Sequence, residues 1–338
     1  MEFAPRMSRF KASPSQIASA RVRDLQAEGR DIIKLTAGEP DFPAPDSAKR
    51  AVIELMDRNE IQYTPVNGTL AMRQAVQAKF KRDNGLVYAL DQIAVGSGSK
   101  QVLFNALMAT VSSGDEAIIP GPYWASYPDM VKLAGGTPVF VMAGQNEKFK
   151  MRPEALEAAI TAQTKWLMFC SPGNPTGAAY SWDELRSLAD VLLRHPHVHI
   201  LTDDVYEHLI FDGHKFATLA QVEPQLFDRT VTCNSVSKAY SMTGFRCGYA
   251  GGPKEIIAKM SNMQSQSTAG AGAVGQAAAV GALNGPQDLL AERAANLQRR
   301  RDILFEKLNG AESLNCDLPD GAMYIFCACA GLIGKKAP

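Results

Sequence analysis

This sequence first of all lacks an excess of charge of either sign. Its 338 residues include 35 lysines and arginines and 35 aspartates and glutamates, so the formal net charge is zero. A neutral chain has no overall field to hold nucleic acid or an anionic membrane surface. The basic triplet Arg299–Arg301 lies in an amphipathic stretch, and we interpret it as a solvated helix face. We therefore predict no nucleic-acid partner.

Long apolar segments are also missing. The longest uncharged run, Ser261–Gln287, is rich in alanine, glycine, serine and glutamine rather than leucine, so it makes a poor membrane span. It predicts instead a small-residue helix packed closely against another element. The first sixteen residues carry scattered arginine and lysine and have no apolar core region, so they do not read as a signal peptide. We predict no membrane partner and a cytoplasmic location.

Cysteines with the spacing of metal ligands are absent as well. None of the six cysteines forms a C-x-x-C pair, and Cys327 and Cys329 are two apart in a strand-like run. This usage predicts no disulfide framework but free, mostly buried thiols in a reducing compartment. Neither a carboxylate cluster nor a cysteine cluster completes a ligand set around His195, His197 and His199. We predict a loop and a strand edge there, and no metal site.

The signatures of serine hydrolases are incomplete. Ser235 and Lys238 match the S-x-x-K spacing of penicillin-recognising acyl enzymes, but the accompanying S-D-N and K-T-G tripeptides do not occur. A G-x-S-x-G nucleophile elbow is missing too. These absences exclude a serine hydrolase.

The composition is that of a folded globular protein. Hydrophobic residues make up 46% and charged residues 21%, which argues against intrinsic disorder. Strand-like and helix-like segments alternate along the chain, which predicts an α/β fold with a mostly parallel sheet covered by helices. The predicted strands are Asp91–Val95, Glu116–Pro120, Thr137–Met142, Lys165–Cys170, Val198–Thr202, Thr230–Asn234 and Cys247–Gly251. The predicted helices between them are one from about Gln101, Glu154–Ile160 and Trp182–Arg194.

Both ends of the chain predict a second, smaller unit. A helix is expected over Ser15–Glu28, a long helix over Pro286–Asn309 with Gly310 as its stop, and a strand over Ala322–Ala330. One face of the long helix is lined by Leu290, Leu297, Leu304 and Leu308. We predict a large domain over residues 45–285 and a small domain made of residues 1–44 and 286–338.

Polar or aromatic clusters follow five of the predicted strands. In a sheet of this kind the ligand binds beyond the carboxyl ends of the strands, so such clusters mark a candidate site. They are Gly96–Lys100, Pro122–Trp124, Ser171–Gly177, Asp203–Tyr206 and Ser235–Lys238.

Lys238 is the most specific of these signals. A lysine at the end of a core strand has little structural reason to be there. Burial and nearby cations lower the pKa of such an amine, so that it can form a Schiff base. Arg246, eight residues later, can bind a phosphate through two hydrogen bonds.

The other clusters leave alternatives open. The loop before the helix at Gln101 can cradle an anion or be a plain turn. Asp203 follows an apolar strand and needs a partner, which can be a ligand, a structural ion pair or a helix cap. Trp124 can stack on a planar ligand or fill the core.

Several segments resemble the motifs of one enzyme family. Ser235–Gly248 is similar to the cofactor-attachment segment of class I pyridoxal-phosphate aminotransferases. Other segments resemble further motifs of that family in the same order, namely Leu35–Phe42, Tyr63–Gly68, Pro122–Trp124 and Asn174–Gly177. The resemblance covers essentially the whole chain and points to the bacterial aspartate, prephenate and aromatic branch. It implies fold type I of pyridoxal-phosphate enzymes, with a smaller, incomplete α+β domain.

The resemblance also implies a role for each site residue. Lys238 would hold pyridoxal 5′-phosphate covalently, Asp203 would keep its ring nitrogen protonated, and Tyr206 would hydrogen-bond its phenolic oxygen. Further cofactor contacts are implied at Gly98, Ser99, Lys100, Trp124, Asn174, Ser235, Ser237 and Arg246. Substrate contacts are implied at Gly38, Trp124 and Asn174.

The resemblance further implies substrates and an assembly. The substrates would be an L-amino acid and a 2-oxo acid such as 2-oxoglutarate, with aspartate, glutamate, aromatic and prephenate-linked donors all open. Tyr63 would reach the phosphate of a neighbouring subunit, so a homodimer with shared sites is expected.

One departure from the family pattern keeps other functions open. Members of the family continue beyond the position of Pro338, through a stretch with an arginine that grips the substrate carboxylate, so we expect a C-terminal truncation. The alternatives are a pyridoxal-phosphate lyase or decarboxylase on the same fold and an inactive, truncated cofactor-binding module. We do not expect a regulator with an aminotransferase-like sensor, because the residues ahead of Gly38 are too few for a DNA-binding domain.

Overall fold

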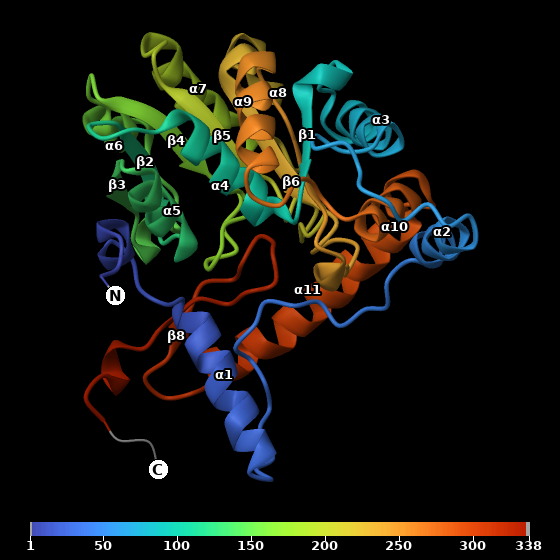
Figure 1. Cartoon of the computed structure of the whole chain (residues 1–338). Coiled ribbons are helices and arrows are strands. Elements are labelled where there is room, and N and C mark those ends of the chain that lie inside the picture. Colours follow the sequence, from blue (N-terminus) through green and yellow to red (C-terminus); the bar gives the residue numbers. More distant parts are fainter. Residues whose placement is uncertain (1, 336–338) are drawn as a thin grey trace.

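A seven-stranded sheet forms the centre of the computed structural model, which describes residues 2–335 (Figure 1). The strand order is β1-β7-β6-β5-β4-β2-β3, and only β7 runs antiparallel to its neighbours. This arrangement confirms the predicted α/β class. The strands are β1 (Ile93–Gly96), β2 (Glu116–Gly121), β3 (Thr137–Met142), β4 (Thr164–Phe169), β5 (His199–Asp203), β6 (Thr230–Ser235) and β7 (Gly248–Gly251).

The central strands are apolar because both faces of the sheet are covered. Every residue of β6 is buried, as is typical of strands between two helical layers. Side chains alternate between the two helical layers. Trp166 and Met168 pack with α4 (Ser99–Thr110) and α5 (Ser126–Ala134), whereas Leu167 and Phe169 pack with α7 (Trp182–Arg194). The helices of the large unit are α2 (Asp46–Asp57), α3 (Leu70–Lys79), α4 (Ser99–Thr110), α5 (Ser126–Ala134), α6 (Pro153–Ala159), α7 (Trp182–Arg194), α8 (Leu219–Val222), α9 (Lys254–Ser265) and α10 (Ala273–Asn284).

Most predicted elements are confirmed within a few residues, and β3 and α7 match at both ends. Helix α4 begins at Ser99 rather than near Gln101, because Gly98, at a φ of +86°, ends the extended backbone there. The uncharged run Ser261–Gln287 is not one helix, since it holds the end of α9 and the whole of α10. Helix α10 is the small-residue helix. It packs so closely on α2 that a Cβ on Gly281 would lie 2.5 Å from the carbonyl oxygen of Ser47.

A smaller unit lies on one side of the large one (Figure 1). It holds α1 (Pro14–Ala27), α11 (Asp288–Asn309) and the short antiparallel pair β8 (Asn315–Cys316) and β9 (Cys327–Ala328). Helix α11 ends where predicted, with Gly310 as its cap. Its leucine face is covered only in part, since Leu297 is buried whereas Leu304 is 47% exposed toward the cavity described below.

The predicted strand Ala322–Ala330 is wrong for most of its length. Only Cys327 and Ala328 pair with another strand. The backbone before them bonds to loops of the large unit instead. The amide of Gly321 donates to the carbonyl of Gly177 at 2.9 Å, and that of Ala322 to the carbonyl of Leu209 at 2.8 Å. This segment is therefore a loop held against the strand ends of the sheet.

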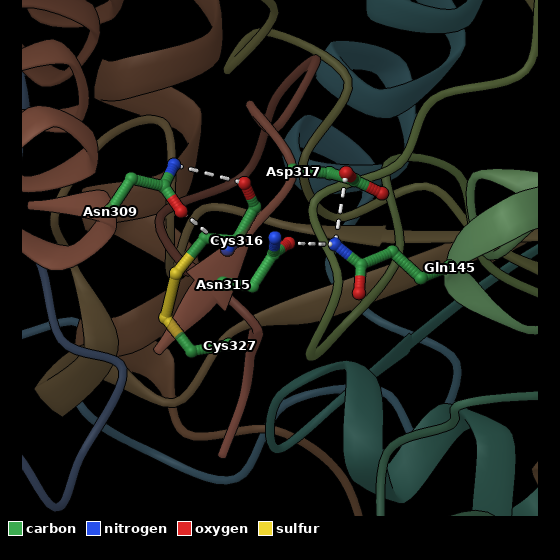
Figure 2. Close-up of a disulfide and its surroundings, with 6 residues drawn as sticks. All are labelled: Gln145, Asn309, Asn315, Cys316, Asp317 and Cys327. Atoms are coloured by element: carbon green, nitrogen blue, oxygen red, sulfur yellow. Dashed lines mark hydrogen bonds between the residues drawn. A yellow bond between two sulfur atoms is a disulfide. The ribbon is translucent and has the colours of Figure 1, made fainter. Parts of the chain in front are cut away.

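The prediction of free thiols only is also wrong. Cys316 and Cys327 form a disulfide at the base of that loop (Figure 2). They are opposite each other in the β8–β9 pair, a register that their spacing in the sequence could not reveal. Asn309 fixes the hairpin further, because its side chain bonds both the amide and the carbonyl of Cys316 (Figure 2). The free cysteines are Cys170, Cys233, Cys247 and Cys329.

The division into domains at residues 45 and 285 stays a proposal. Residue 1 and residues 336–338 lie outside the described part of the chain. Within residues 2–335, every helix is too short or too polar to cross a bilayer.

Candidate functional site

A cavity of about 1530 Å³ opens beyond the carboxyl ends of β4, β5 and β6. It lies between the two units, since residues of α1 and α11 line it together with the loops that follow the strands. Ser235 and Gly98 are buried and do not line it, and Tyr63 is outside it with a side chain that is 99% exposed. The predicted site residues that line it are Gly38, Ser99, Lys100, Trp124, Asn174, Asp203, Tyr206, Ser237, Lys238 and Arg246.

Asp203 ends β5 as a buried carboxylate with one oxygen unpaired. The hydroxyl of Tyr127 donates to its Oδ2 at 2.8 Å, whereas its Oδ1 has no partner among the described residues. Burial raises the pKa of Asp203 to about 6, although Tyr127 and Lys238 act in the opposite direction. A buried, unpaired carboxylate oxygen at a cavity wall is suited to a cationic N–H group of a ligand.

Lys238 projects into the same cavity from the turn after β6. Its ammonium group donates a hydrogen bond to the carbonyl of Gly38 and lies 5.9 Å from the ring centre of Tyr206. Burial lowers the pKa of Lys238, and the nearby Arg246 adds to this effect, against the opposing charges of Asp203 and Glu39. The amine is therefore easier to deprotonate than an exposed lysine, as a nucleophile requires.

The start of α4 and the side chain of Arg246 form an anion-binding corner. Gly98 lies so close to the guanidinium that a Cβ there would overlap Nη2 of Arg246. The amides of Ser99 and Lys100, in the first turn of α4, have no hydrogen-bond partner within residues 2–335. Arg246 donates only to backbone carbonyls, at 2.8 Å to Thr243 and 3.4 Å to Ser97, and pairs with no carboxylate of the described chain.

Two serines support this corner in different ways. Ser237 lines the cavity. Ser235 is buried behind it, and its hydroxyl accepts a hydrogen bond from the amide of Ser237 at 3.2 Å. Ser235 thus shapes the loop that presents Ser237.

Trp124 connects two groups of the site. The ammonium of Lys100 lies 4.6 Å from the centre of its ring, and Tyr127 packs edge-to-face against it at 5.4 Å. Burial lowers the pKa of Lys100, and Arg246 lowers it further. The indole therefore links the cationic corner to the tyrosine that holds Asp203.

Two tyrosines of the site were missed by the sequence analysis. Tyr127 bonds Asp203 across 76 residues of sequence, and its position three residues after Trp124 at the start of a helix is the signal that could have found it. Tyr324 comes from the loop that was expected to be a strand, and its hydroxyl lies 2.6 Å from that of Tyr206. Asn174 donates to the same hydroxyl of Tyr324 at 3.4 Å.

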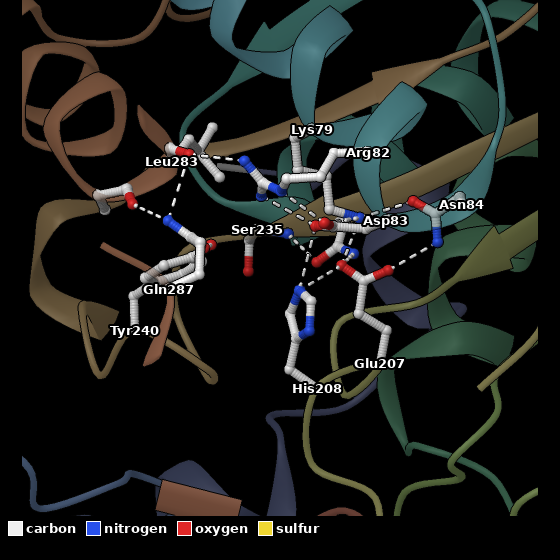
Figure 3. A network of polar contacts seen from close by, with 12 residues as sticks. Lys79, Arg82, Asp83, Asn84, Glu207, His208, Ser235, Tyr240, Leu283 and Gln287 are labelled. Carbon is white, nitrogen blue, oxygen red and sulfur yellow. Dashed lines mark hydrogen bonds and ion pairs between the residues drawn. The ribbon is translucent and has the colours of Figure 1, made fainter. Parts of the chain in front are cut away.

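A buried polar network lies behind the site (Figure 3). Glu207, the residue after Tyr206, pairs with the ammonium of Lys79 and accepts hydrogen bonds from Asn84 at 2.9 Å and Asn234 at 2.8 Å. Asn234 in turn precedes Ser235 and accepts its amide at 2.7 Å. The network therefore joins the loop that carries Tyr206 to the end of β6.

The same network holds three groups with the spacing of metal ligands, namely Asp83, Glu207 and His208. Burial opposes the ionisation of Glu207, but the charges of Lys79 and His208 hold its pKa below the ordinary value. Since the ammonium of Lys79 already pairs with this carboxylate, we interpret the cluster as an ion-pair network.

Comparison with known proteins supports the resemblance to aminotransferases over nearly the whole chain. Residues 30–336 match the family model described as aminotransferase class I and II. The chain is 53% identical over 335 residues to a probable aspartate/prephenate aminotransferase of Rhizobium leguminosarum bv. phaseoli, covering 99% of this chain and 84% of that protein. It is also 53% identical over 331 residues to an aspartate/prephenate aminotransferase of Cereibacter sphaeroides, covering 98% of this chain and 83% of that protein.

Solved structures agree with this likeness. The aspartate aminotransferase of Rhizobium meliloti superimposes with a TM-score of 0.95 at 49% identity, over 100% of this chain and 84% of that one. The aspartate aminotransferase of Thermus thermophilus with maleate gives 0.93 at 36% identity, over 99% and 87%. These matches confirm both the resemblance and the expected fold type I.

Proposed function

This chain belongs to the class I and II aminotransferase family, and from that premise we propose that it transfers the amino group of an acidic L-amino acid, aspartate among them, to a 2-oxo acid. It is an aminotransferase that depends on pyridoxal 5′-phosphate. The nature of the amino acid is the new part of the proposal. No contact within residues 2–335 favours lyase or decarboxylase chemistry instead.

The residues of the site fit this cofactor. When bound, the cofactor supplies an aldehyde and an electron-withdrawing ring that stabilises negative charge at the substrate Cα. We assign the unpaired Oδ1 of Asp203 to its ring nitrogen and the amine of Lys238 to covalent attachment. The corner formed by Gly98, Ser99 and Arg246 would hold its phosphate.

The charge of the cavity carries the substrate proposal. Arg23, Lys34 and Lys100 line it, and none of the three pairs with a carboxylate of the described residues. The acidic residues of the lining are Asp203 and Glu39, and Glu39 accepts a hydrogen bond from the hydroxyl of Thr243. An excess of unpaired cations favours substrates with more than one carboxylate. The names of the relatives, aspartate/prephenate aminotransferases, support the same class.

Covalent attachment at Lys238 is tested by borohydride reduction of the protein loaded with pyridoxal 5′-phosphate, followed by peptide mapping. We expect the label on Lys238 alone. Lys100 is the internal control, because it lines the same cavity with a lowered pKa. A label on Lys100 or on any other lysine would contradict the assignment.

Preference for acidic substrates is tested by comparing kcat/KM for aspartate and for phenylalanine. We expect Lys100→Met to lower the value for aspartate by about 10- to 100-fold, because a desolvated carboxylate loses its partner. The value for phenylalanine should change much less. Lys215→Met, at an exposed lysine outside the cavity, is the matched control. Equal losses for both substrates would contradict the proposal.

We also propose a homodimer with shared sites. Tyr63 is 99% exposed, and large exposed hydrophobic residues accompany it in the same part of the chain, namely Ile53, Met56, Ile61 and Leu70. An exposed apolar group of this kind favours burial against a second copy. Tyr63 of one subunit would then contact the phosphate corner of the other.

Subunit mixing tests this arrangement. Lys238→Ala and Tyr63→Phe dimers should each be impaired, whereas a mixed dimer contains one site with both residues intact. We therefore expect activity to recover after the two variants are unfolded together and refolded. Mixing that restores nothing, although mixed dimers form, would contradict shared sites.

A cytoplasmic location is a further proposal, and the Cys316–Cys327 pair gives it a test. Disulfides are rare in reducing compartments, so in living cells both residues should be thiols. Acid quenching of cells followed by alkylation and mapping would detect them. A fully bonded pair in the cell would contradict this location.

A further inference from the structure

We propose that Tyr324 is a positioning residue, whose hydroxyl orients the hydroxyl of Tyr206 toward the cofactor and ties it to the small unit. This inference rests on the proposed function, because it assumes a ligand oxygen in front of Tyr206. It adds a residue that the predicted motifs do not contain.

Tyr324 touches three separate parts of the site. Its hydroxyl lies 2.6 Å from that of Tyr206, which follows β5, and 3.4 Å from Nδ2 of Asn174, which follows β4. It also lies against Gly38, where a Cβ would overlap the phenol. Gly38 in turn accepts the hydrogen bond of Lys238. One hydroxyl therefore touches the tyrosine, the amide and the glycine that surround the reactive lysine.

The number of available protons determines which tyrosine donates the hydrogen bond between Tyr324 and Tyr206. A tyrosine hydroxyl has a single proton to donate. If Tyr206 donates its proton to a ligand oxygen, the 2.6 Å contact needs the proton of Tyr324. Asn174 donates to the oxygen of Tyr324, which leaves that proton free for Tyr206. The order is then Asn174 to Tyr324 to Tyr206 to ligand, in which each bond strengthens the next.

The surroundings keep both hydroxyls protonated. Burial raises the pKa of Tyr324 to about 12 and that of Tyr206 well above its ordinary value. The ionisable groups around the pair come from three strand ends: Cys170 after β4, Asp203 at the end of β5 and Lys238 after β6. At neutral pH the pair therefore acts through hydrogen bonds and not through its own ionisation.

The loop that carries Tyr324 is held firmly enough to orient a neighbour. The carbonyl of Asp320 accepts the amide of Phe211 at 2.9 Å, and its carboxylate accepts the amide of Ala179 at 3.1 Å. Arg301 of α11 donates to the carbonyl of Pro319 at 2.8 Å. At the base of the loop, the side chain of Asn309 bonds both the amide and the carbonyl of Cys316 (Figure 2). A side chain fixed on both sides can hold Tyr206 within the tolerance that a site needs.

The test is a pH titration of the protein loaded with pyridoxal 5′-phosphate. The near-ultraviolet and visible absorbance is measured at each pH. A hydrogen bond donated to a ligand oxygen stabilises the negative charge left there after the ligand loses its proton. Weaker donation by Tyr206 therefore raises the pH of that transition. For Tyr324→Phe we expect a rise of about half a unit to one unit, the size of one net hydrogen bond.

Two further variants separate orientation from a merely structural role. Tyr206→Phe should raise the transition at least as much, and the double variant should equal Tyr206→Phe alone, because Tyr324 acts only through Tyr206. The control is Tyr180→Phe, which removes another buried hydroxyl outside the cavity, one that accepts the amide of Met151 at 2.5 Å. It should lower stability without moving the transition.

A 3-fluorotyrosine at position 324 tests the same hydrogen bond without removing the hydroxyl that Tyr324→Phe removes. It keeps the hydroxyl but makes it a stronger donor, so the transition should move to lower pH. An unchanged transition in Tyr324→Phe, or additive shifts in the double variant, would overturn the inference. A parent protein that fails to take up the cofactor at Lys238 would overturn the proposed function and this inference with it.

Discussion

Single atoms decide the chemistry that this site can perform. Asp203 offers one oxygen to Tyr127 and keeps the other unpaired, so the carboxylate is both fixed and available. Asp204, the next residue, is also buried, but it does not line the cavity and is near the charge of Glu207. Two adjacent carboxylates thus have different environments, and only the first faces the cavity.

Asp203→Asn should impair turnover far more than cofactor binding. The amide still accepts the hydroxyl of Tyr127, but it cannot balance a positive charge on the ring nitrogen. We expect kcat to fall by about 10²- to 10⁴-fold, while the Kd for pyridoxal 5′-phosphate changes much less. Steady-state assays and absorbance titrations measure the two quantities.

Asp204→Asn is the matched control for that prediction. Burial and the charge of Glu207 raise the pKa of Asp204 to about 8, so at pH 7 the group is mostly neutral and an amide resembles it. We expect little change in kcat. Near-parental turnover in Asp203→Asn would mean that Asp203 is only structural.

Gly98→Ala should weaken the phosphate corner selectively. Its φ of +86° strains any other residue, and the added Cβ would displace the guanidinium of Arg246. We expect the Kd for pyridoxal 5′-phosphate to rise by about tenfold or more, and that for pyridoxal, which has no phosphate, to change less. Gly114→Ala has a similar φ of +95° and no neighbour within 4 Å, so it controls for backbone strain alone. If both ligands lose affinity equally, Gly98 does not act through the phosphate.

At the scale of elements, the hairpin β8–β9 determines how one loop meets the sheet. The loop between the two strands bonds to the segments after β4 and β5 and carries Tyr324 into the cavity. Two strands of two residues each cannot hold such a loop by themselves. The disulfide and the side chain of Asn309 supply the missing constraint (Figure 2).

The double variant Cys316→Ser/Cys327→Ser should lower the free energy of unfolding by about 2–3 kcal/mol, because the unfolded chain loses a cross-link that closes a short loop. Urea denaturation of the oxidised protein measures this loss. Cys329→Ser, at an exposed free cysteine, is the control and should have little effect. A reducing agent should destabilise the parent but not the double variant. A parent that is indifferent to reduction would show that the bond contributes nothing.

At the scale of the whole molecule, a buried charge network joins helices to the sheet. Lys79 at the end of α3 and His208 after β5 meet at Glu207 (Figure 3). Removing one member leaves an uncompensated buried charge, which is costly. The network therefore couples the stability of the molecule to pH.

Stability should fall as the pH rises from about 6.5 to about 9. Burial lowers the pKa of His208, but Glu207 and Asp83 outweigh this effect and raise it from 6.5 to about 9. Below pH 6.5 the folded and the unfolded protein both bind the proton, so the contribution is complete. Between pH 6.5 and pH 9 only the folded protein keeps the proton on His208. The free energy of unfolding therefore falls by on the order of 2 kcal/mol across that window.

Thermal unfolding at several pH values measures this dependence. The fall in stability between pH 6.5 and pH 9 should be smaller in His208→Gln. It should be the same as in the parent in His197→Gln, because His197 is exposed. Identical pH profiles for the parent and His208→Gln would contradict the assignment.

The sequence by itself determined the framework of the large unit. Apolar segments of strand length alternate with amphipathic helices, and this local pattern was enough to place β3 and α7 at their true ends. The cluster at each strand end was equally readable, because parallel strands bring their carboxyl ends to one edge. For this reason Asp203, Lys238 and Arg246 could be expected to share a cavity, and they do.

Only the tertiary structure decided which distant residues meet. The bond from Tyr127 to Asp203 and the contact between Tyr324 and Tyr206 join segments 76 and 118 residues apart. The Cys316–Cys327 bond depends on a strand register that includes only two residues a side. Local periodicity says which way a side chain faces within its own element, but it holds no information on which other element will lie opposite. That choice is made by the packing of the whole chain.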